Sequence, residues 1–177
     1  MDKLMEFLPF MLQGAVVTIE LFALTIVISL PLGLPIALGS NSRIKPLSII
    51  CKIYVWIFRG TPLLLQLFFF YFFFPLVLNI QMNAFVTVVL TYVLNYAAYF
   101  AEIYRGGINS IDRGQYEAAH ALGLSKRQTM GDIILPQTMK AILPPVVNET
   151  ITLVKDTALA SSLPVIELMK ATNSAVN

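Results

Sequence analysis

A stripe of polar side chains recurs at helical spacing within an otherwise apolar stretch. Its intervals are four, four and three residues, so a helix carries the whole set on one face. Inside a bilayer such a face must meet protein or a water-filled cavity, because lipid offers it no hydrogen bonds. The pattern predicts, about equally, helix–helix hydrogen bonding or the wall of a substrate cavity. The members of this stripe are Thr91, Asn95, Tyr99 and Glu102.

A second polar set interrupts the apolar stretch that begins near residue 142. Asn148, Thr152 and Lys155 lie at i, i+4 and i+7, and Asp156 follows Thr152 by four residues. Ionisable groups in a membrane helix are costly and indicate function by default. Lys155 and Asp156 are sequence neighbours, so they pair poorly with each other and each needs another partner. The alternative is a helix only partly embedded at the edge of the bundle.

The sequence lacks the residue patterns of common catalytic, metal-binding and nucleic-acid-binding sites. There is no phosphate-binding G-x-x-x-x-G-K-[ST] loop, H-E-x-x-H helix or nucleophile elbow. The single Cys51 excludes an intrachain disulfide and a cysteine metal cluster, and the single His120 is expected on the surface. No basic run interleaved with aromatic residues suggests nucleic acid. The sequence therefore predicts a non-enzymatic chain without a catalytic residue, metal or cofactor of its own.

Composition indicates a polytopic membrane protein. The chain has 177 residues, of which 57% are hydrophobic and 12% charged, whereas about 25% charged residues is usual in soluble domains. There is too little charge for a polar shell. We expect an all-α membrane helical bundle forming a single transmembrane domain over residues 1–177.

The apolar runs predict about four membrane-spanning helices, near residues 14–38, 63–80, 84–103 and 142–163, after an interfacial segment ending at Gln13. Residues 40–60 carry four basic residues and no acidic one, which predicts a cytoplasmic loop. Counting spans from there places the N-terminus outside. It also places the polar loop at about residues 105–140 inside.

That polar loop predicts two short helices joined at a glycine corner. Asp112 with Gln115, and Ser125 with Gln128, have the spacing of capping boxes at two helix starts. Gly123 is a natural left-handed helix stop between them. Pro136 predicts a break or kink at the preceding residue.

The motifs of this loop resemble the EAA loop of the membrane permease subunits of ABC importers. They are Glu117-Ala118-Ala119, Gly123 after three further residues, and Ile133-x-Leu135-Pro136 after nine more. Three other segments resemble the polar amino acid branch of that family, which carries histidine, glutamine, arginine or cystine. They begin at Arg59-Gly60-Thr61-Pro62, Ala101-Glu102-Ile103-Tyr104 and Leu143-Pro144-Pro145.

The resemblance implies a type I ABC importer permease that works by alternating access in the bacterial cytoplasmic membrane. Its implied partners are a cytoplasmic ATPase dimer that holds ATP and Mg, a second permease subunit in a homo- or heterodimer, an extracytoplasmic amino acid-binding protein and membrane lipid. The loop would be the coupling helix that docks on the ATPase. Its implied coupling residues are Glu117, Ala118, Ala119, Gly123, Leu135 and Pro136.

An amino acid substrate brings an ammonium and a carboxylate that both lose water, so its cavity should offer opposite charges and amides. Glu102 or Asp156 would attract the ammonium, and Asn95 would hydrogen-bond. Lys155 would meet the carboxylate or pair with an acidic neighbour. The predicted pathway residues are Thr91, Asn95, Tyr99, Glu102, Thr152, Lys155 and Asp156.

Two alternatives remain open at this point. Glu102, Lys155 and Asp156 could instead form the proton relay of an ion-coupled secondary transporter or membrane enzyme, although such a protein needs no ATPase dock. The family usually has a fifth span, and no apolar run follows Leu168. A truncated or regulatory permease-like subunit is therefore the other alternative.

Overall fold

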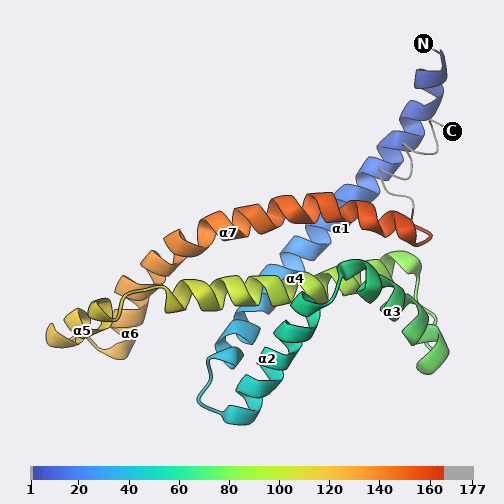
Figure 1. Cartoon of the computed structure of the whole chain (residues 1–177). Helices are drawn as coiled ribbons and strands as arrows, with labels where there is room; N and C mark the ends of the chain where they lie inside the picture. Colours follow the sequence, from blue (N-terminus) through green and yellow to red (C-terminus); the bar gives the residue numbers. More distant parts are fainter. Residues whose placement is uncertain (1, 166–177) are drawn as a thin grey trace.

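The computed structural model describes residues 2–165, with side chains from Pro9 onward, and every secondary-structure element within that range is helical (Figure 1). The prediction of an all-α protein is confirmed. Two long helices, α1 (Asp2–Ser40) and α4 (Ala84–Asn109), cross within the bundle. Both are long and apolar enough to span a membrane.

α1 is one continuous helix of 39 residues. No break in the helix marks the predicted boundary between an interfacial segment and a span at Gln13. Pro9, Pro31 and Pro35 all lie inside the helix. In a membrane helix, neighbouring helices and local adjustments can satisfy the carbonyl groups that proline frees.

The second predicted span, near residues 63–80, is the second member of a broken pair of helices. α2 (Lys45–Gly60) and α3 (Leu63–Val77) meet at an angle of 108°, and the predicted loop over residues 40–60 is wrong because most of it is α2. Basic residues report the side of a membrane, not the backbone conformation. α3 has 15 residues, or roughly 22 Å at about 1.5 Å per residue, which is short for a bilayer core of about 30 Å.

The number of apolar spans is lower than predicted within the described residues. α1 and α4 qualify alone, and α2 with α3 would add a third if the bent pair is one span. α7 (Leu135–Asp156) has 22 residues but does not qualify, because polar residues such as Glu149 and Lys155 interrupt it. It continues into a 3-10 segment, η2 (Thr157–Ser162). The sequence also predicts a short helix over residues 164–169 after the fourth span, and this segment lies largely outside the described residues.

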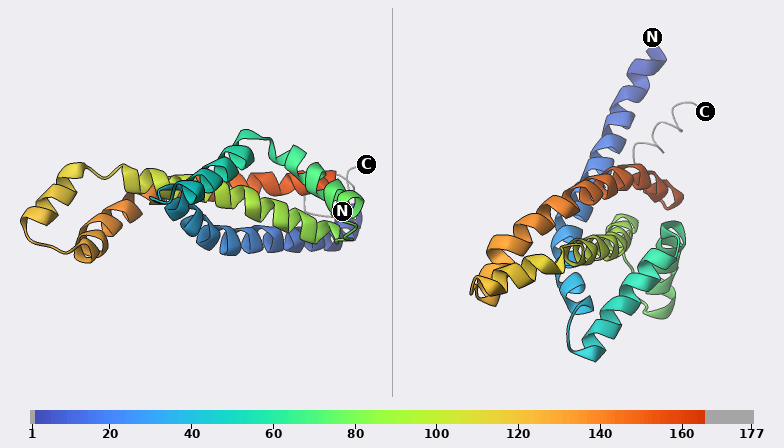
Figure 2. Two further views of the ribbon diagram at one scale, coloured as in Figure 1. Left: turned by 90° about the horizontal axis from the view of Figure 1, so that it is seen from below. Right: turned by 60° about the vertical axis from the view of Figure 1, so that its left-hand side comes forward.

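α4 is the centre of the bundle. It packs against α1, α2, α3 and α7 (Figures 1 and 2), and its Tyr92, Tyr96 and Phe100 are fully buried. The α1–α4 crossing is close at Gly33, where an added Cβ would lie 2.9 Å from the Phe100 Cβ and 3.0 Å from the Ala101 backbone nitrogen.

The loop between α4 and α7 projects from one end of the bundle (Figure 2). It contains α5 (Arg113–Ala121), α6 (Lys126–Gln128) and a π-helical turn, η1 (Thr129–Ile134). The predicted capping box forms at Ser125 and Gln128. Asp112 caps α5 through the Gly114 N–H at 2.6 Å, but Gln115 does not complete a box and instead accepts a 3.1 Å hydrogen bond from Gln137 of α7.

The corner itself follows the sequence prediction. Gly123 has φ +75°, and its N–H donates to the His120 carbonyl while that of Leu124 donates to Ala119. These two bonds form a Schellman motif. Of the predicted break or kink before Pro136, the break does not form, although the helix changes there from the π-helical turn η1 to α7. Leu135 is helical, with φ −61° and ψ −44°, and Pro136 occupies the first turn of α7, where its missing N–H is tolerated.

We expect Gly33→Ala to lower the melting temperature of the detergent-solubilised protein by roughly 2–12 °C, since overpacking costs about 1–3 kcal/mol. Gly106→Ala is the matched control, because Gly106 also lies within a helix and no atom lies within 4 Å of its added Cβ. Both variants gain helix propensity, so their difference isolates the α1–α4 contact. Equal melting temperatures would contradict close packing at Gly33.

Candidate functional site

The break between α2 and α3 leaves backbone carbonyl groups without helical partners. The Phe58 carbonyl would pair with the N–H of residue 62 in a continuous helix, but that residue is Pro62 and has none. The buried Gln66 amide nitrogen lies 2.9 Å from the Phe58 carbonyl and 2.7 Å from the Thr61 hydroxyl oxygen. The Thr61 hydroxyl in turn donates to the Ile57 carbonyl at 2.8 Å.

Asn95 of α4 completes this arrangement. Its side-chain nitrogen donates to the Phe58 carbonyl at 3.0 Å and to the Gln66 side-chain oxygen at 2.9 Å. We call Thr61, Gln66 and Asn95 the elbow clamp. The sequence singled out Asn95 as a substrate ligand; in the structure its amide nitrogen holds the broken helix.

A cavity of about 540 Å³ opens beside this clamp, and we call it the elbow cavity. It draws polar groups from α2, α4 and α7. Four predicted pathway residues line it: Asn95, Tyr99, Thr152 and Asp156. Arg59 and Glu149 also line it. It therefore presents one cation and two carboxylates to whatever enters.

The Asp156 carboxylate is held in place by a tyrosine of α4. The Tyr96 hydroxyl donates to Asp156 Oδ2 at 2.7 Å, and the Tyr92 hydroxyl donates to the Asp156 backbone carbonyl. Both tyrosine side chains are buried. The carboxylate therefore has a fixed orientation at the end of α7.

Three predicted pathway residues do not line the elbow cavity. The buried Thr91 hydroxyl donates to the Thr87 carbonyl of its own helix at 2.7 Å. Lys155 is exposed. Glu102 lies on a second cavity. The three members of the possible proton relay thus face different surroundings, which does not favour a relay through them.

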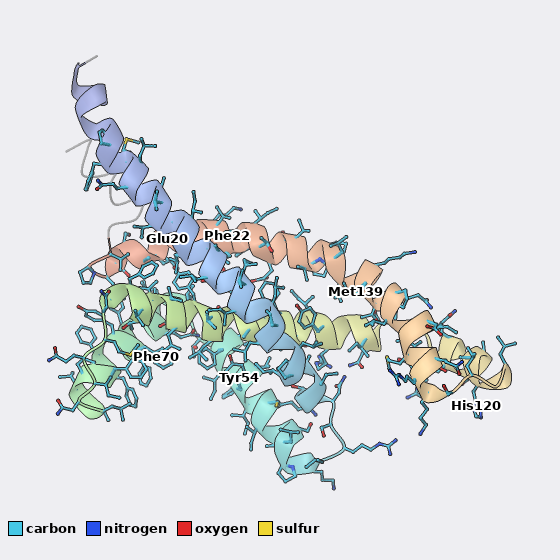
Figure 3. All side chains as sticks on the ribbon, turned by 180° about the vertical axis from the view of Figure 1, so that it is seen from behind. Glu20, Phe22, Tyr54, Phe70, His120 and Met139 are labelled. Carbon is cyan, nitrogen blue, oxygen red and sulfur yellow. The ribbon has the colours of Figure 1, made fainter. Side chains whose placement is uncertain are left out.

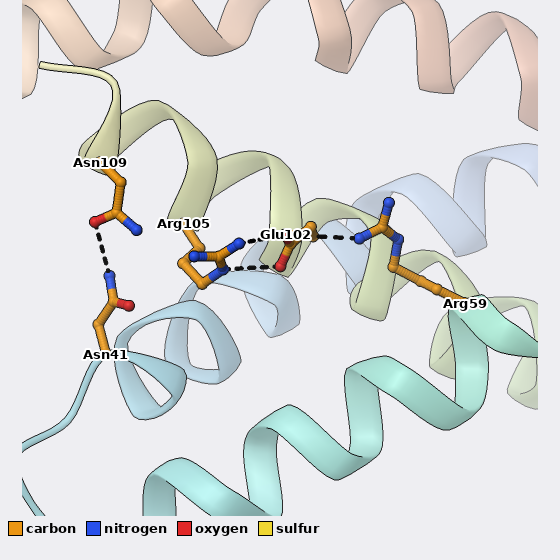
Figure 4. Close-up of polar contacts among 5 residues, drawn as sticks. All are labelled: Asn41, Arg59, Glu102, Arg105 and Asn109. Atoms are coloured by element: carbon orange, nitrogen blue, oxygen red, sulfur yellow. Dashed lines mark hydrogen bonds and ion pairs between the residues drawn. The ribbon is translucent and has the colours of Figure 1, made fainter.

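The second cavity, of about 570 Å³, shares Arg59 and Gly60 with the elbow cavity, and we call it the basic cavity. Lys52, Arg59, Arg105 and Glu102 line it together with Trp56. The Arg105 Nε donates to Glu102 Oε2 at 2.9 Å, and Arg59 Nη1 lies 3.8 Å from Glu102 Oε1 (Figure 4). The i, i+3 pairing considered for Glu102 and Arg105 is present.

Sequence reasoning missed several contributors to the site. Arg59 belongs to α2, Gln66 to α3 and Thr61 to the break between them, all outside the two stripes. Glu149 had a signal, since it precedes Asp156 by seven residues and thus shares its helix face. The face of α7 toward the cavity carries Glu149, Thr152 and Asp156, whereas Asn148 and Lys155 of the predicted polar set do not line it.

The predicted coupling residues lie in the projecting loop and at the start of α7. Glu117 and Ala118 are exposed, while Ala119 is buried against the loop. Leu135 and Pro136 are exposed as well. His120 lies at the outer end of the loop, as expected of a surface residue (Figure 3). The exposed Glu117 and Ala118 leave one side of α5 available to a partner.

A helical bundle with a charged cavity at a broken helix and a projecting loop defines a membrane transport component. The chain belongs to the family described as binding-protein-dependent transport system inner membrane component, whose model matches residues 29–171. The family predicted from the EAA motif is confirmed.

The relatives of this chain are named as amino acid permeases. A putative glutamine transport system permease protein of Rickettsia prowazekii (strain Madrid E) is 39% identical over 161 residues, which cover 91% of this chain and 74% of that one. The arginine transport system permease protein ArtQ of Bacillus subtilis (strain 168) is 41% identical over 163 residues, covering 92% and 74%.

Two solved structures share the fold. A crystal structure of an amino acid ABC transporter with histidines matches with a TM-score of 0.90 and 35% identity, over 97% of this chain and 79% of that one. An inward-facing MetNI methionine ABC transporter matches with a TM-score of 0.59 and 19% identity over 96% and 86%. The predicted type I permease fold is confirmed.

We expect Gln66→Leu to destabilise the protein by about 1–3 kcal/mol, because it leaves the Phe58 and Thr61 carbonyls short of a donor. The control is Gln81→Leu, at an exposed position between α3 and α4. Thermal unfolding of both purified variants measures the difference. A Gln66→Leu protein as stable as the control would show that the clamp does not hold the elbow.

Proposed function

We propose that this chain is the permease subunit of an ATP-driven importer that moves a polar amino acid by alternating access. The observation that carries the proposal is the charge pattern of the elbow cavity, where Arg59 faces Glu149 and Asp156. An α-amino acid is a zwitterion, so it matches one cation and nearby carboxylates. The names of the relatives, which include glutamine and arginine permeases, support the same substrate class.

The roles within the cavity follow from charge. Asp156, oriented by Tyr96, and Glu149 attract the substrate ammonium. Arg59 attracts the carboxylate through a planar guanidinium, which suits two-point contact with a carboxylate. Asn95 acts by holding the elbow, and Tyr99 and Thr152 line the remaining wall.

The partners proposed are those of the family architecture. Two permease subunits form the path, and a binding protein delivers the substrate from outside. A cytoplasmic ATPase pair, which holds ATP and Mg, receives the projecting loop around Glu117 and Gly123. The chain sits in the bacterial cytoplasmic membrane with its N-terminus outside, consistent with the basic residues before and within α2. It makes and breaks no covalent bond and carries no cofactor of its own.

We expect Asp156→Asn to lower import by roughly tenfold or more, since hydrogen bonds to charged groups contribute about 1.5–3 kcal/mol. Asparagine keeps the shape and an acceptor for Tyr96, so folding should survive. The measurement is uptake of labelled glutamine, arginine and cystine by the assembled transporter in proteoliposomes. Glu20→Gln, at an exposed site on α1, is the control.

Wild-type uptake of one of these amino acids, with Asp156→Asn depressed and Glu20→Gln unchanged, supports the proposal. If Asp156→Asn imports at the wild-type affinity and rate, the elbow cavity is not the binding site. If the wild-type transporter imports none of the three, the proposed substrate class fails.

We expect Gly123→Val to weaken docking of the ATPase while the protein still inserts in the membrane. The space around Gly123 is open, so the effect comes from φ +75°, which a β-branched residue adopts only with strain. Gly123→Asn is the matched control, because asparagine tolerates left-handed geometry. Co-purification of the ATPase and uptake are measured. Full uptake by well-expressed Gly123→Val would contradict the role of the corner.

A further inference from the structure

Arg59 belongs to both cavities. It lies in the last turn of α2, immediately before the break, and it lines the elbow cavity and the basic cavity alike. Its guanidinium carbon lies 5.2 Å from the centre of the Tyr99 ring, a cation–π distance. The side chain is 40% exposed, so packing does not fully enclose it.

Glu102 holds its two arginine neighbours unequally. Arg105 makes a two-point contact, with Nε donating to Oε2 at 2.9 Å and Nη2 donating to Oε1. Arg59 approaches only to 3.8 Å, as an ion pair beyond hydrogen-bond distance (Figure 4). The tight Arg105 contact keeps Glu102 in position, and Arg59 is the partner that can leave.

Arg59 therefore shares each of its two cavities with at least one carboxylate. Glu149 and Asp156 share the elbow cavity with it, and Glu102 shares the basic cavity. A guanidinium cannot deprotonate at physiological pH, so it must stay paired with a carboxylate or with water. A substrate carboxylate in the elbow cavity would compete with Glu102 for the same cation.

We propose that Arg59 is a movable counter-charge, and that Glu102 sets substrate retention by competing with the substrate carboxylate for it. The inference rests on the proposed function, in which the elbow cavity takes a zwitterionic amino acid. When substrate is bound, Arg59 turns into the elbow cavity. When substrate leaves, Arg59 returns toward Glu102. Arg105 is a positioning residue. By binding both carboxylate oxygens of Glu102, it weakens the attraction of Glu102 for Arg59.

Removing the charge of Glu102 and removing that of Arg105 should then have opposite effects on substrate binding. Glu102→Gln removes the competitor, so substrate should bind more tightly and dissociate more slowly, by about two- to fivefold. Arg105→Gln frees Glu102 for Arg59, so substrate should bind more weakly by a similar factor. A salt bridge with a merely structural role would change both variants in the same direction.

The experiment uses the permease–ATPase complex in lipid nanodiscs without ATP, with labelled glutamine, arginine and cystine as probes. Equilibrium binding and dissociation of the probe are measured for wild type, Glu102→Gln and Arg105→Gln. Glu102→Gln is also made in an Arg59→Gln background, where its effect should vanish because the competed cation is gone. Melting temperatures of all variants check folding.

Opposite shifts that disappear in the Arg59→Gln background support the inference. Shifts in one direction, no shift, or a Glu102 effect that persists without Arg59 would each overturn it. Wild-type binding of a probe separates this failure from that of the proposed function. If the wild-type complex binds none of the probes, the substrate class fails and this inference fails with it.

Discussion

The break between α2 and α3 removes helical hydrogen bonds, and the backbone groups that it frees need other partners. Pro62 has no N–H for the Phe58 carbonyl, and an unpaired carbonyl in an apolar environment costs several kcal/mol. The structure meets this constraint with side chains, since Gln66 and Asn95 both donate to that one oxygen. Because Asn95 comes from α4, the elbow is tied to the central helix of the bundle.

The hydrogen bond from Asn95 to the Phe58 carbonyl also determines where the positive charge of Arg59 lies. Arg59 follows Phe58 directly, so a fixed Phe58 carbonyl fixes the point from which the arginine side chain extends. The side chain then meets Tyr99 and Glu102, which lie four and seven residues after Asn95 on α4. One face of α4 therefore does two things. Asn95 holds the break between α2 and α3, and Tyr99 and Glu102, further along the same face, contact Arg59. The polar stripe serves both alternatives that its spacing left open, packing and cavity wall.

Sequence reasoning succeeded where structure depends on local chemistry. The turn at Gly123 and the capping box at Ser125 depend on a few neighbouring residues, and both form as expected. It failed where the structure depends on contacts between segments that are distant in the sequence. The bend at Pro62 needed donors from Gln66 and Asn95, and periodicity within one helix cannot identify them. The pairing of Arg59 with Glu102 joins two helices and was invisible for the same reason.

The connection between the cavity and the projecting loop is made of helix rather than flexible chain. α4 runs from Asn95 to Asn109, close to the start of α5, and α7 runs without a break from η1 to Asp156. Gln137 of α7 donates to Gln115 of α5, so the loop is also joined to α7 directly. A displacement of the loop must shift these two helices, because helical hydrogen bonds resist stretching along the axis. Tyr96 on α4 holds Asp156 on α7, and a relative movement of the two helices would therefore alter the very carboxylate that faces the elbow cavity.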